Sequence, residues 1–233
     1  MSITWQTLIS NEVWWCQPFL EVDTLDRVLA GMSASEISVL DGSKRKHAVG
    51  DTYYNYNVVK LDVRQDRNLI DEVFGKLNQL LIDLGETPVD TSQELGYLQF
   101  FAKSFNAESR YDLHAETRAM FGKYVFVAYL SDENTGELVL PTEQEADAYL
   151  DAHPANRQGW QQTRDTCAAE GHPVRHVGPL TIRPRLNGCV VMKTGAAHYV
   201  NPVTDGGWRP TLSGWVYATD AYVNWYKSNN TSQ

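Results

Sequence analysis

Hydrophobic and polar positions follow different patterns on the two sides of residue 92. Before it, apolar residues recur every three or four positions from Asn68 to Leu84, which predicts a helix with one buried face. Gly85 follows as the expected C-terminal stop. A second helix is predicted over Leu20–Met32, and Gly50–Val63, rich in Tyr and Val, is predicted to form a strand or an extended loop. The apolar face of the longer helix comprises Leu69, Ile70, Val73, Phe74, Leu77, Leu80 and Leu81.

After residue 92 the chain is typical of short strands separated by turn residues. Strands that follow helices in this way favour an α+β fold, with a jelly-roll core and the N-terminal helices packed on one face. The predicted strands are Leu95–Phe105, Ser109–Glu116, Lys123–Ser131, Glu137–Pro141, Gly178–Pro184, Gly188–Lys193, Ala197–Val203 and Arg209–Thr219.

A polar, helix-prone stretch from Thr142 to Val177 interrupts the series of strands. We interpret it as an insertion between the fourth and fifth strands, serving as a lid, as a partner surface such as a homodimer contact, or as a solvated decoration. The predicted organisation is therefore an N-terminal helical and mixed support region, 1–91, and a catalytic core, 92–233, with an insertion at 142–177.

The charge and the cysteine content indicate which binding partners and which cellular compartment to expect. The chain carries 20 basic and 29 acidic residues, a net charge of −9, so nucleic acid and anionic membranes are disfavoured as main partners. It has no apolar run of about 18 residues and no signal-peptide pattern at its N-terminus. The three cysteines are widely spaced and do not resemble a disulfide framework, so we expect a cytoplasmic protein.

Three residues are candidates for a metal site. On a strand, His114 and Glu116 would point to the same face, because side chains alternate. An imidazole and a carboxylate are two of the three ligands of a facial triad for non-heme Fe(II). His198, which follows an apolar strand and a turn of small residues, is the candidate third ligand. A His-x-Glu pair alone is a weak signal, since polar surface pairs share its spacing.

Further short motifs follow this pair in a fixed order. They are AYLSD at 128–132, TGELVLP at 135–141, IRPRLNG at 182–188, HYVNPV at 198–203 and RPTLSGW at 209–215. With His114-x-Glu116, they make the stretch from Leu95 to Tyr217 resemble the Fe(II)/2-oxoglutarate-dependent oxygenases, in particular the prolyl-4-hydroxylase-like branch.

The resemblance implies a double-stranded β-helix in which His114, Glu116 and His198 bind Fe(II). It implies that Arg209, with help from Thr211 and Tyr129, binds the co-substrate 2-oxoglutarate. Arginine suits a carboxylate because it offers two parallel N–H donors and keeps its proton. The residues to which the resemblance assigns binding roles are His114, Glu116, His198, Arg209, Thr211 and Tyr129.

The implied activity is that of a dioxygenase, an oxidoreductase that consumes dioxygen and 2-oxoglutarate and releases succinate and CO2. The implied substrate is a peptidyl, prolyl-like group or a small molecule, which would be hydroxylated. The family usually has Asp where this chain has Glu116, which is one methylene longer and still an oxygen ligand. Because halogenases of the family lack this carboxylate, Glu116 favours hydroxylation or a related oxidation over halogenation.

Two alternatives remain at this level. One is a cupin-like metalloenzyme that does not use 2-oxoglutarate and in which Arg209 has no role. The other is a non-catalytic jelly-roll binding module, which would not bind Fe(II) tightly.

Overall fold

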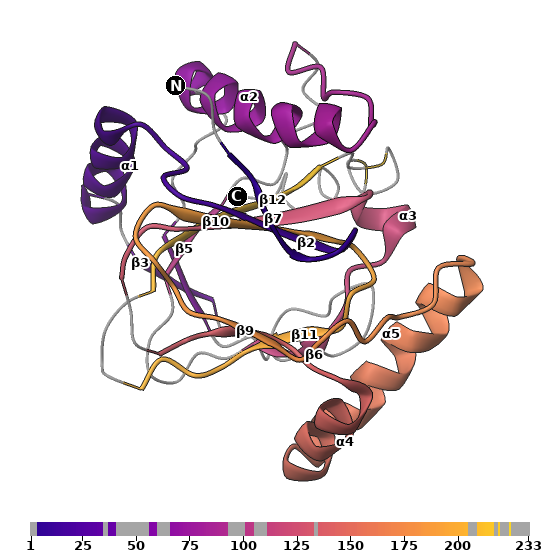
Figure 1. Ribbon diagram of the computed structural model, residues 1–233. Helices are drawn as coiled ribbons and strands as arrows, with labels where there is room; N and C mark the ends of the chain where they lie inside the picture. The colour runs from indigo at the N-terminus through magenta and orange to yellow at the C-terminus, as the bar shows by residue number, and fades with distance from the viewer. Residues whose placement is uncertain are drawn as a thin grey trace.

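Two antiparallel sheets face each other in this computed structural model (Figure 1). The structure describes residues 4–34, 37–40, 56–59, 66–92, 101–104, 111–132, 135–204, 209–216, 219 and 224. The larger sheet has the order β1-β2-β10-β7-β12-β5-β4-β3, and the smaller has the order β6-β11-β8-β9. The predicted α+β fold is confirmed.

Each of the eight predicted strands contains an observed strand; β10 has the predicted bounds, and the other seven are shorter. They are β5 (Phe101–Ser104), β6 (Tyr111–His114), β7 (Tyr124–Tyr129), β8 (Leu138–Leu140), β9 (Leu180–Ile182), β10 (Gly188–Lys193), β11 (His198–Val200) and β12 (Thr211–Val216). Parts of three predicted strands, 95–100, 105, 109–110 and 217–218, lie outside the described residues. Within 50–63, β4 (Tyr56–Val59) is a strand, paired with β3 (Ile37–Leu40), and the rest lies outside the described residues.

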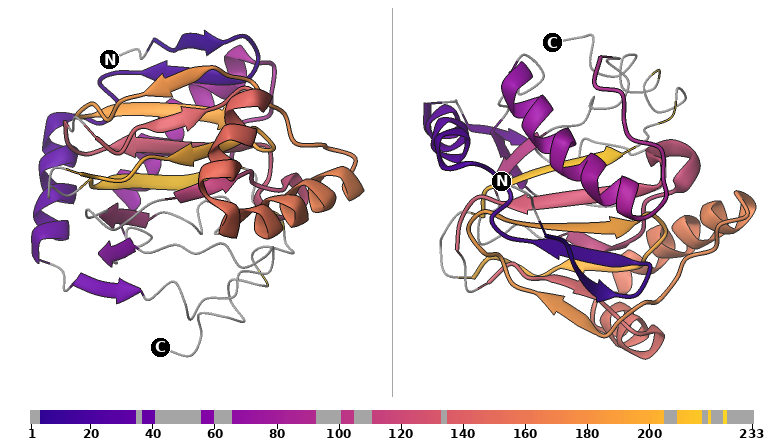
Figure 2. Two further views of the ribbon diagram at one scale, coloured as in Figure 1. Left: turned by 90° about the horizontal axis from the view of Figure 1, so that it is seen from below. Right: turned by 45° about the horizontal axis from the view of Figure 1, so that its top comes forward.

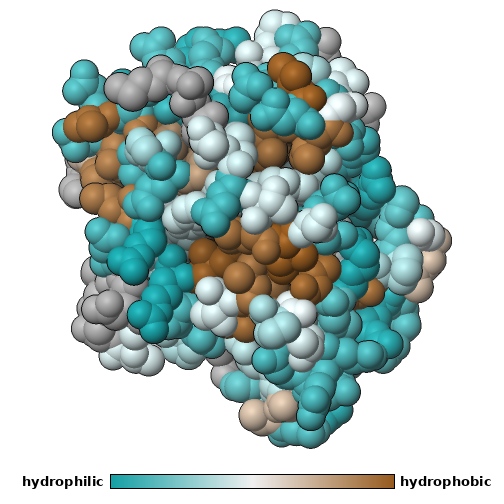
Figure 3. Space-filling model, viewed as in Figure 1, coloured by the Kyte–Doolittle hydropathy of each residue, from teal (hydrophilic) through white to brown (hydrophobic). Residues whose placement is uncertain are grey.

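The central strand β7 shows how the sheet separates two cores. Val125 and Tyr129 belong to the cluster between the two sheets, which we call the inner core, whereas Phe126 and Ala128 belong to the outer core under the helices. Alternation of side chains along a strand produces this division. On the side of the molecule seen in Figure 1, hydrophobic side chains gather between the sheets (Figure 3).

Helices α1 (Val22–Ala34) and α2 (Arg67–Asp83) cover the outer face of the larger sheet (Figure 1). All seven apolar positions predicted for α2 are buried, and Asp66 caps the helix by accepting a hydrogen bond from the Leu69 amide. Gly85 follows with φ +73°, as the predicted stop requires. The first helix begins two residues later than predicted, at Val22, and continues two residues past the predicted end at Met32, to Ala34.

An N-terminal hairpin, which the sequence pattern did not reveal, completes one edge of the larger sheet. Its strands are β1 (Gln6–Ile9) and β2 (Val13–Cys16), and β2 pairs with β10 (Figure 2). The sequence of β2 does not indicate a strand, because both of its faces are apolar: Val13 contributes to the inner core, and Trp14 and Cys16 contribute to the outer core. A strand buried on both faces shows no alternation of polar and apolar residues.

The stretch from 142 to 177 forms two helices, α4 (Glu143–Ala152) and α5 (Arg157–Ala169), between β8 and β9. Thr142 begins α4 in a capping box with Glu145, which fixes the start of the helix. Both helices lie against the smaller sheet, on the side away from α1 and α2 (Figure 1). A short helix, α3 (Arg118–Phe121), follows β6. None of the helices in the described part of the chain has the length and hydropathy needed to cross a membrane.

Candidate active site

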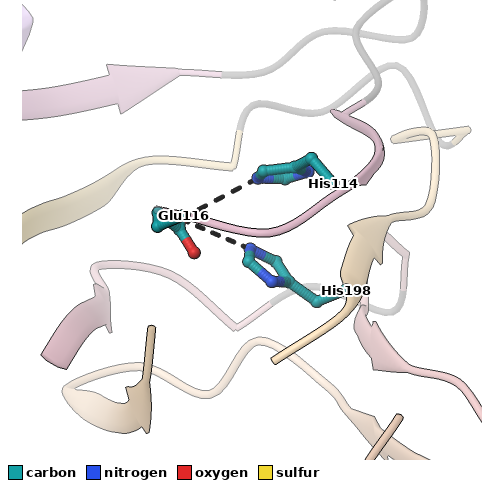
Figure 4. Close-up of side chains that lie close together, drawn as sticks. All are labelled: His114, Glu116 and His198. Atoms are coloured by element: carbon teal, nitrogen blue, oxygen red, sulfur yellow. Dashed lines mark ion pairs between the residues drawn. The ribbon is translucent and has the colours of Figure 1, made fainter. Parts of the chain in front are cut away.

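The structure brings the three candidate metal ligands together (Figure 4). One ligand atom from each of His114, Glu116 and His198 lies within 4.8 Å of the others. The Oε1 atom of Glu116 is 3.9 Å from Nε2 of His114 and 3.5 Å from Nε2 of His198. The two histidines are partners in the β6–β11 ladder, so strand pairing places their rings side by side, with 4.2 Å between centroids.

Backbone contacts determine which nitrogen of each imidazole is available. Nδ1 of His114 lies 2.6 Å from the carbonyl oxygen of Asp112, and Nδ1 of His198 lies 2.9 Å from that of Ala196. A carbonyl oxygen only accepts hydrogen bonds, so each Nδ1 carries the proton. In the neutral rings Nε2 therefore has the lone pair, and both Nε2 atoms face Glu116. This is the tautomer that a histidine needs to bind a metal through Nε2.

Glu116 reaches the site from a different position than expected. We predicted it on the strand, but β6 ends at His114, and Glu116 lies in the loop that follows. Its side chain is buried, and within the described structure its Oε2 atom makes no hydrogen bond. A buried carboxylate oxygen without a donor is costly, and a cation between the three side chains would stabilise it. Two neutral imidazoles and one carboxylate suit Fe(II).

The three predicted co-substrate residues also lie together and are buried. Thr211 on β12 is the register partner of Tyr129 on β7. Arg209 precedes β12 instead of beginning it as we predicted, and its guanidinium carbon is 5.6 Å from the centre of the Tyr129 ring. Among the described residues, the Tyr129 hydroxyl makes no hydrogen bond. A buried guanidinium beside a buried hydroxyl suits a carboxylate ligand.

Comparison with solved structures supports the predicted double-stranded β-helix architecture. A Pseudomonas putida prolyl-4-hydroxylase matches with a TM-score of 0.51 and 16% identity, over 90% of this chain and 94% of that chain. A prolyl hydroxylase from Trichoplax adhaerens, in complex with a hypoxia inducible factor peptide fragment, matches with a TM-score of 0.55 and 11% identity, over 96% and 89%. An oxidoreductase of the 2OG-Fe(II) oxygenase family from Burkholderia pseudomallei matches with a TM-score of 0.51 and 11% identity, over 88% and 85%.

The chain has the fold of the Fe(II)/2-oxoglutarate oxygenases. The predicted double-stranded β-helix is confirmed. No protein-family model and no curated protein sequence matches the chain. At these identities the likeness establishes the fold, so the chemistry rests on the residues that this oxygenase fold brings together.

Burial shifts the pKa values of Tyr129 and Arg209 in this oxygenase fold. It raises the pKa of Tyr129 to about 12, although the positive charge of Arg209 acts in the opposite direction. Burial also lowers the pKa of the Arg209 guanidinium, because a buried cation loses hydration, while Tyr129, Tyr111 and Glu137 oppose this shift. Tyr129 therefore stays protonated at neutral pH and keeps a hydroxyl that can donate to an anion.

Gly136 and Trp15 shape the surroundings of Arg209 and Tyr129, and the sequence analysis assigned neither a role. Arg209 donates a hydrogen bond to the carbonyl of Gly136. A Cβ at Gly136, whose φ is +77°, would lie 2.9 Å from Cδ of Arg209. Trp15 packs on Tyr129 with 6.1 Å between ring centroids. The glycine in the TGELVLP motif was a signal for a close approach, whereas Trp15 gave none because its hairpin was not predicted.

Proposed function

We propose that the protein is an Fe(II)- and 2-oxoglutarate-dependent dioxygenase that hydroxylates its substrate and releases succinate and CO2. The observation that carries this proposal is the arrangement of His114, Glu116 and His198. Both histidines direct Nε2 towards a buried carboxylate, one oxygen of which makes no hydrogen bond among the described residues.

The roles of the residues follow from their chemistry. His114, Glu116 and His198 would hold Fe(II), which when bound supplies the dioxygen activation that couples oxidation of 2-oxoglutarate to hydroxylation of a C–H bond. Three protein ligands leave room for a co-substrate. Arg209 would bind the distal carboxylate of 2-oxoglutarate through its N–H groups, and the hydroxyl of Tyr129 would donate a further hydrogen bond. Thr211, opposite Tyr129 on the same face, would add a second hydroxyl.

Burial of these groups supports their role in binding an anion. Arg209 and Thr211 are 3% and 1% exposed, so a bound carboxylate would be largely removed from water. Charge-assisted hydrogen bonds are stronger where water is excluded. The same exclusion protects the site from side reactions with solvent.

For the primary substrate we propose a peptidyl, prolyl-like group or a small molecule. A peptide is supported by the Trichoplax adhaerens prolyl hydroxylase of the same fold, which was solved with a peptide fragment. The net charge of −9 opposes binding of a phosphate backbone. Release of succinate in the presence of proline-containing peptides or of free amino acids would separate the two substrate classes.

An anaerobic titration tests the proposed function. Fe(II) and then 2-oxoglutarate are added to the purified protein, and the weak visible charge-transfer band of a chelated 2-oxo acid is followed. We expect a saturable band that is lost in His198→Ala and in Arg209→Ala. His172→Ala and Arg183→Ala, which remove the same residue types from exposed positions, are the controls and should retain it.

The outcomes distinguish the alternatives. Metal binding without the band would contradict the use of 2-oxoglutarate and favour the cupin-like metalloenzyme. No binding of metal by the wild-type protein would contradict the metal site and favour a non-catalytic module.

A further inference from the structure

The two helices of the insertion pack directly behind the two metal-binding histidines. His114 and His198 point to one face of the smaller sheet, and their chain neighbours Leu113 and Ala197 point to the other. These neighbours are 1% and 0% exposed, and they belong to one buried cluster with insertion residues. The insertion residues of the cluster are Ala146, Leu150 and Trp160.

One residue of α4, Tyr149, contacts the surroundings of both histidines. Its hydroxyl donates a hydrogen bond of 2.9 Å to Oδ1 of Asp112, a buried residue. The carbonyl of this same Asp112 accepts the bond from Nδ1 of His114. The ring of Tyr149 lies on the ring of Tyr199, with 4.4 Å between centroids, and Tyr199 directly follows His198.

The segment that follows α5 makes backbone hydrogen bonds with the chain just before His198. The Arg175 amide donates to the carbonyl of Gly195, at 2.8 Å, and the Ala197 amide donates to the carbonyl of Arg175, also at 2.8 Å. Between these two contacts lies Ala196, whose carbonyl accepts the hydrogen bond from Nδ1 of His198. The Arg175 side chain is itself anchored by Glu12, through bonds of 3.1 and 2.9 Å.

The segment that carries His114 and the segment that carries His198 are therefore both held by contacts with the insertion. The Asn156 side chain, between α4 and α5, adds a bond of 3.4 Å to the carbonyl of Leu113. Strand β6 contributes a four-residue segment, and β11 a three-residue segment, so their ladder alone supplies few hydrogen bonds. Strand β11 also pairs with β8, and the contacts from behind the sheet add to the rigidity of both segments.

We propose that the α4–α5 insertion is a support that sets the relative positions of His114 and His198, with Tyr149 as its main positioning residue. The proposal rests on the metal site of the proposed function and assigns the insertion a role other than lid, partner surface or solvated decoration. Tyr149 acts through Asp112, whose position determines where the Nδ1 partner of His114 lies. Outer contacts of this kind commonly change metal affinity by about 10–100-fold.

Tyr149→Phe tests the proposal with metal alone. It removes the hydroxyl and leaves the stacked ring in place. Anaerobic titration with Co(II) measures the dissociation constant, and the visible spectrum of bound Co(II) reports the geometry of its ligands. We expect affinity about tenfold weaker and a shifted spectrum, because Asp112 loses the hydrogen bond from Tyr149. The KM for 2-oxoglutarate should remain within about twofold of the wild-type value, since the Arg209 end is unchanged.

Tyr199→Phe is the matched control. It removes a hydroxyl from the same pair of stacked rings, and this hydroxyl makes no hydrogen bond among the described residues. It should bind Co(II) as the wild-type protein does. Wild-type affinity and spectrum in Tyr149→Phe would overturn the proposal, and so would an equal loss in both variants. Failure of the proposed function is seen separately, in the wild-type protein, as Co(II) binding without 2-oxoglutarate binding.

Discussion

Gly136→Ala should damage the proposed 2-oxoglutarate site without touching the proposed metal ligands. Gly136 has φ +77°, and a Cβ there would lie 2.9 Å from Cδ of Arg209 and 3.0 Å from Cγ2 of Val203. The positive φ costs a non-glycine residue about 1–2 kcal/mol. The close contacts add about 1–3 kcal/mol of overpacking, or else move the Arg209 side chain.

Gly85→Ala is the matched control for the backbone cost. Gly85 has φ +73°, and a Cβ there would meet nothing within 4 Å. Both variants therefore share the cost of the left-handed backbone and the change in unfolded-chain entropy. We expect the free energy of unfolding to fall by about 1–2 kcal/mol in Gly85→Ala and by about 2–5 kcal/mol in Gly136→Ala.

The functional difference between the two variants should be larger. Loss of one charge-assisted hydrogen bond from Arg209 to the co-substrate costs about 1.5–3 kcal/mol, which corresponds to a 2-oxoglutarate dissociation constant about 10–150-fold higher. Urea unfolding measures the stability, and the anaerobic charge-transfer titration measures the affinity. Equal stability and equal 2-oxoglutarate affinity in Gly136→Ala and Gly85→Ala would refute the reasoning, because the contact with Arg209 would then have no consequence.

Three further outcomes are expected. His198→Ala should weaken Co(II) binding more than about 100-fold in a titration, since it removes a ligand rather than an outer contact; retained affinity would contradict the metal site. Leu77→Ala, at a buried position of α2, should lower the free energy of unfolding by about 2–5 kcal/mol in urea and leave Co(II) affinity unchanged. The pKa of Glu86 is lowered mainly by the hydrogen bond from Lys123 and also by that from Tyr124. Glu86 should therefore stabilise the fold fully above the unfolded-state pKa of about 4.3. This contribution should vanish as the pH falls through the lower pKa of the folded state. The difference in unfolding free energy between the wild-type protein and Glu86→Gln should thus be constant from about pH 8 to 5 and shrink below that; a difference that grew as the pH fell would have the wrong sign.

Local patterns determined the elements and much of the candidate site. The helix α2 was predictable residue by residue, because its buried face has the period of a helix and Gly85 supplies the conformation needed to end it. The helices of the insertion were predictable from composition. Short motifs supplied the residues of the two proposed binding groups, since a metal triad and a carboxylate clamp each require particular side chains, and the structure brings each group together.

Only the tertiary structure decided which segments meet. The pairing of β6 with β11 places His114 opposite His198, and no local pattern encodes a register between strands so far apart in the chain. Glu116 joins them from a loop and not from the strand, because β6 ends two residues earlier.

The N-terminal hairpin and the insertion are two further cases in which the local sequence did not indicate which segments pack together. Burial on both faces removed the alternation from β2, so the sequence did not reveal that Trp15 packs on Tyr129. The helical period of α4 does not say which surface it covers, and only the folded chain shows Tyr149 behind His114 and His198. Local sequence sets the conformation of each segment through short-range sterics and hydrophobic period, whereas contacts between distant segments depend on the packing of the whole chain.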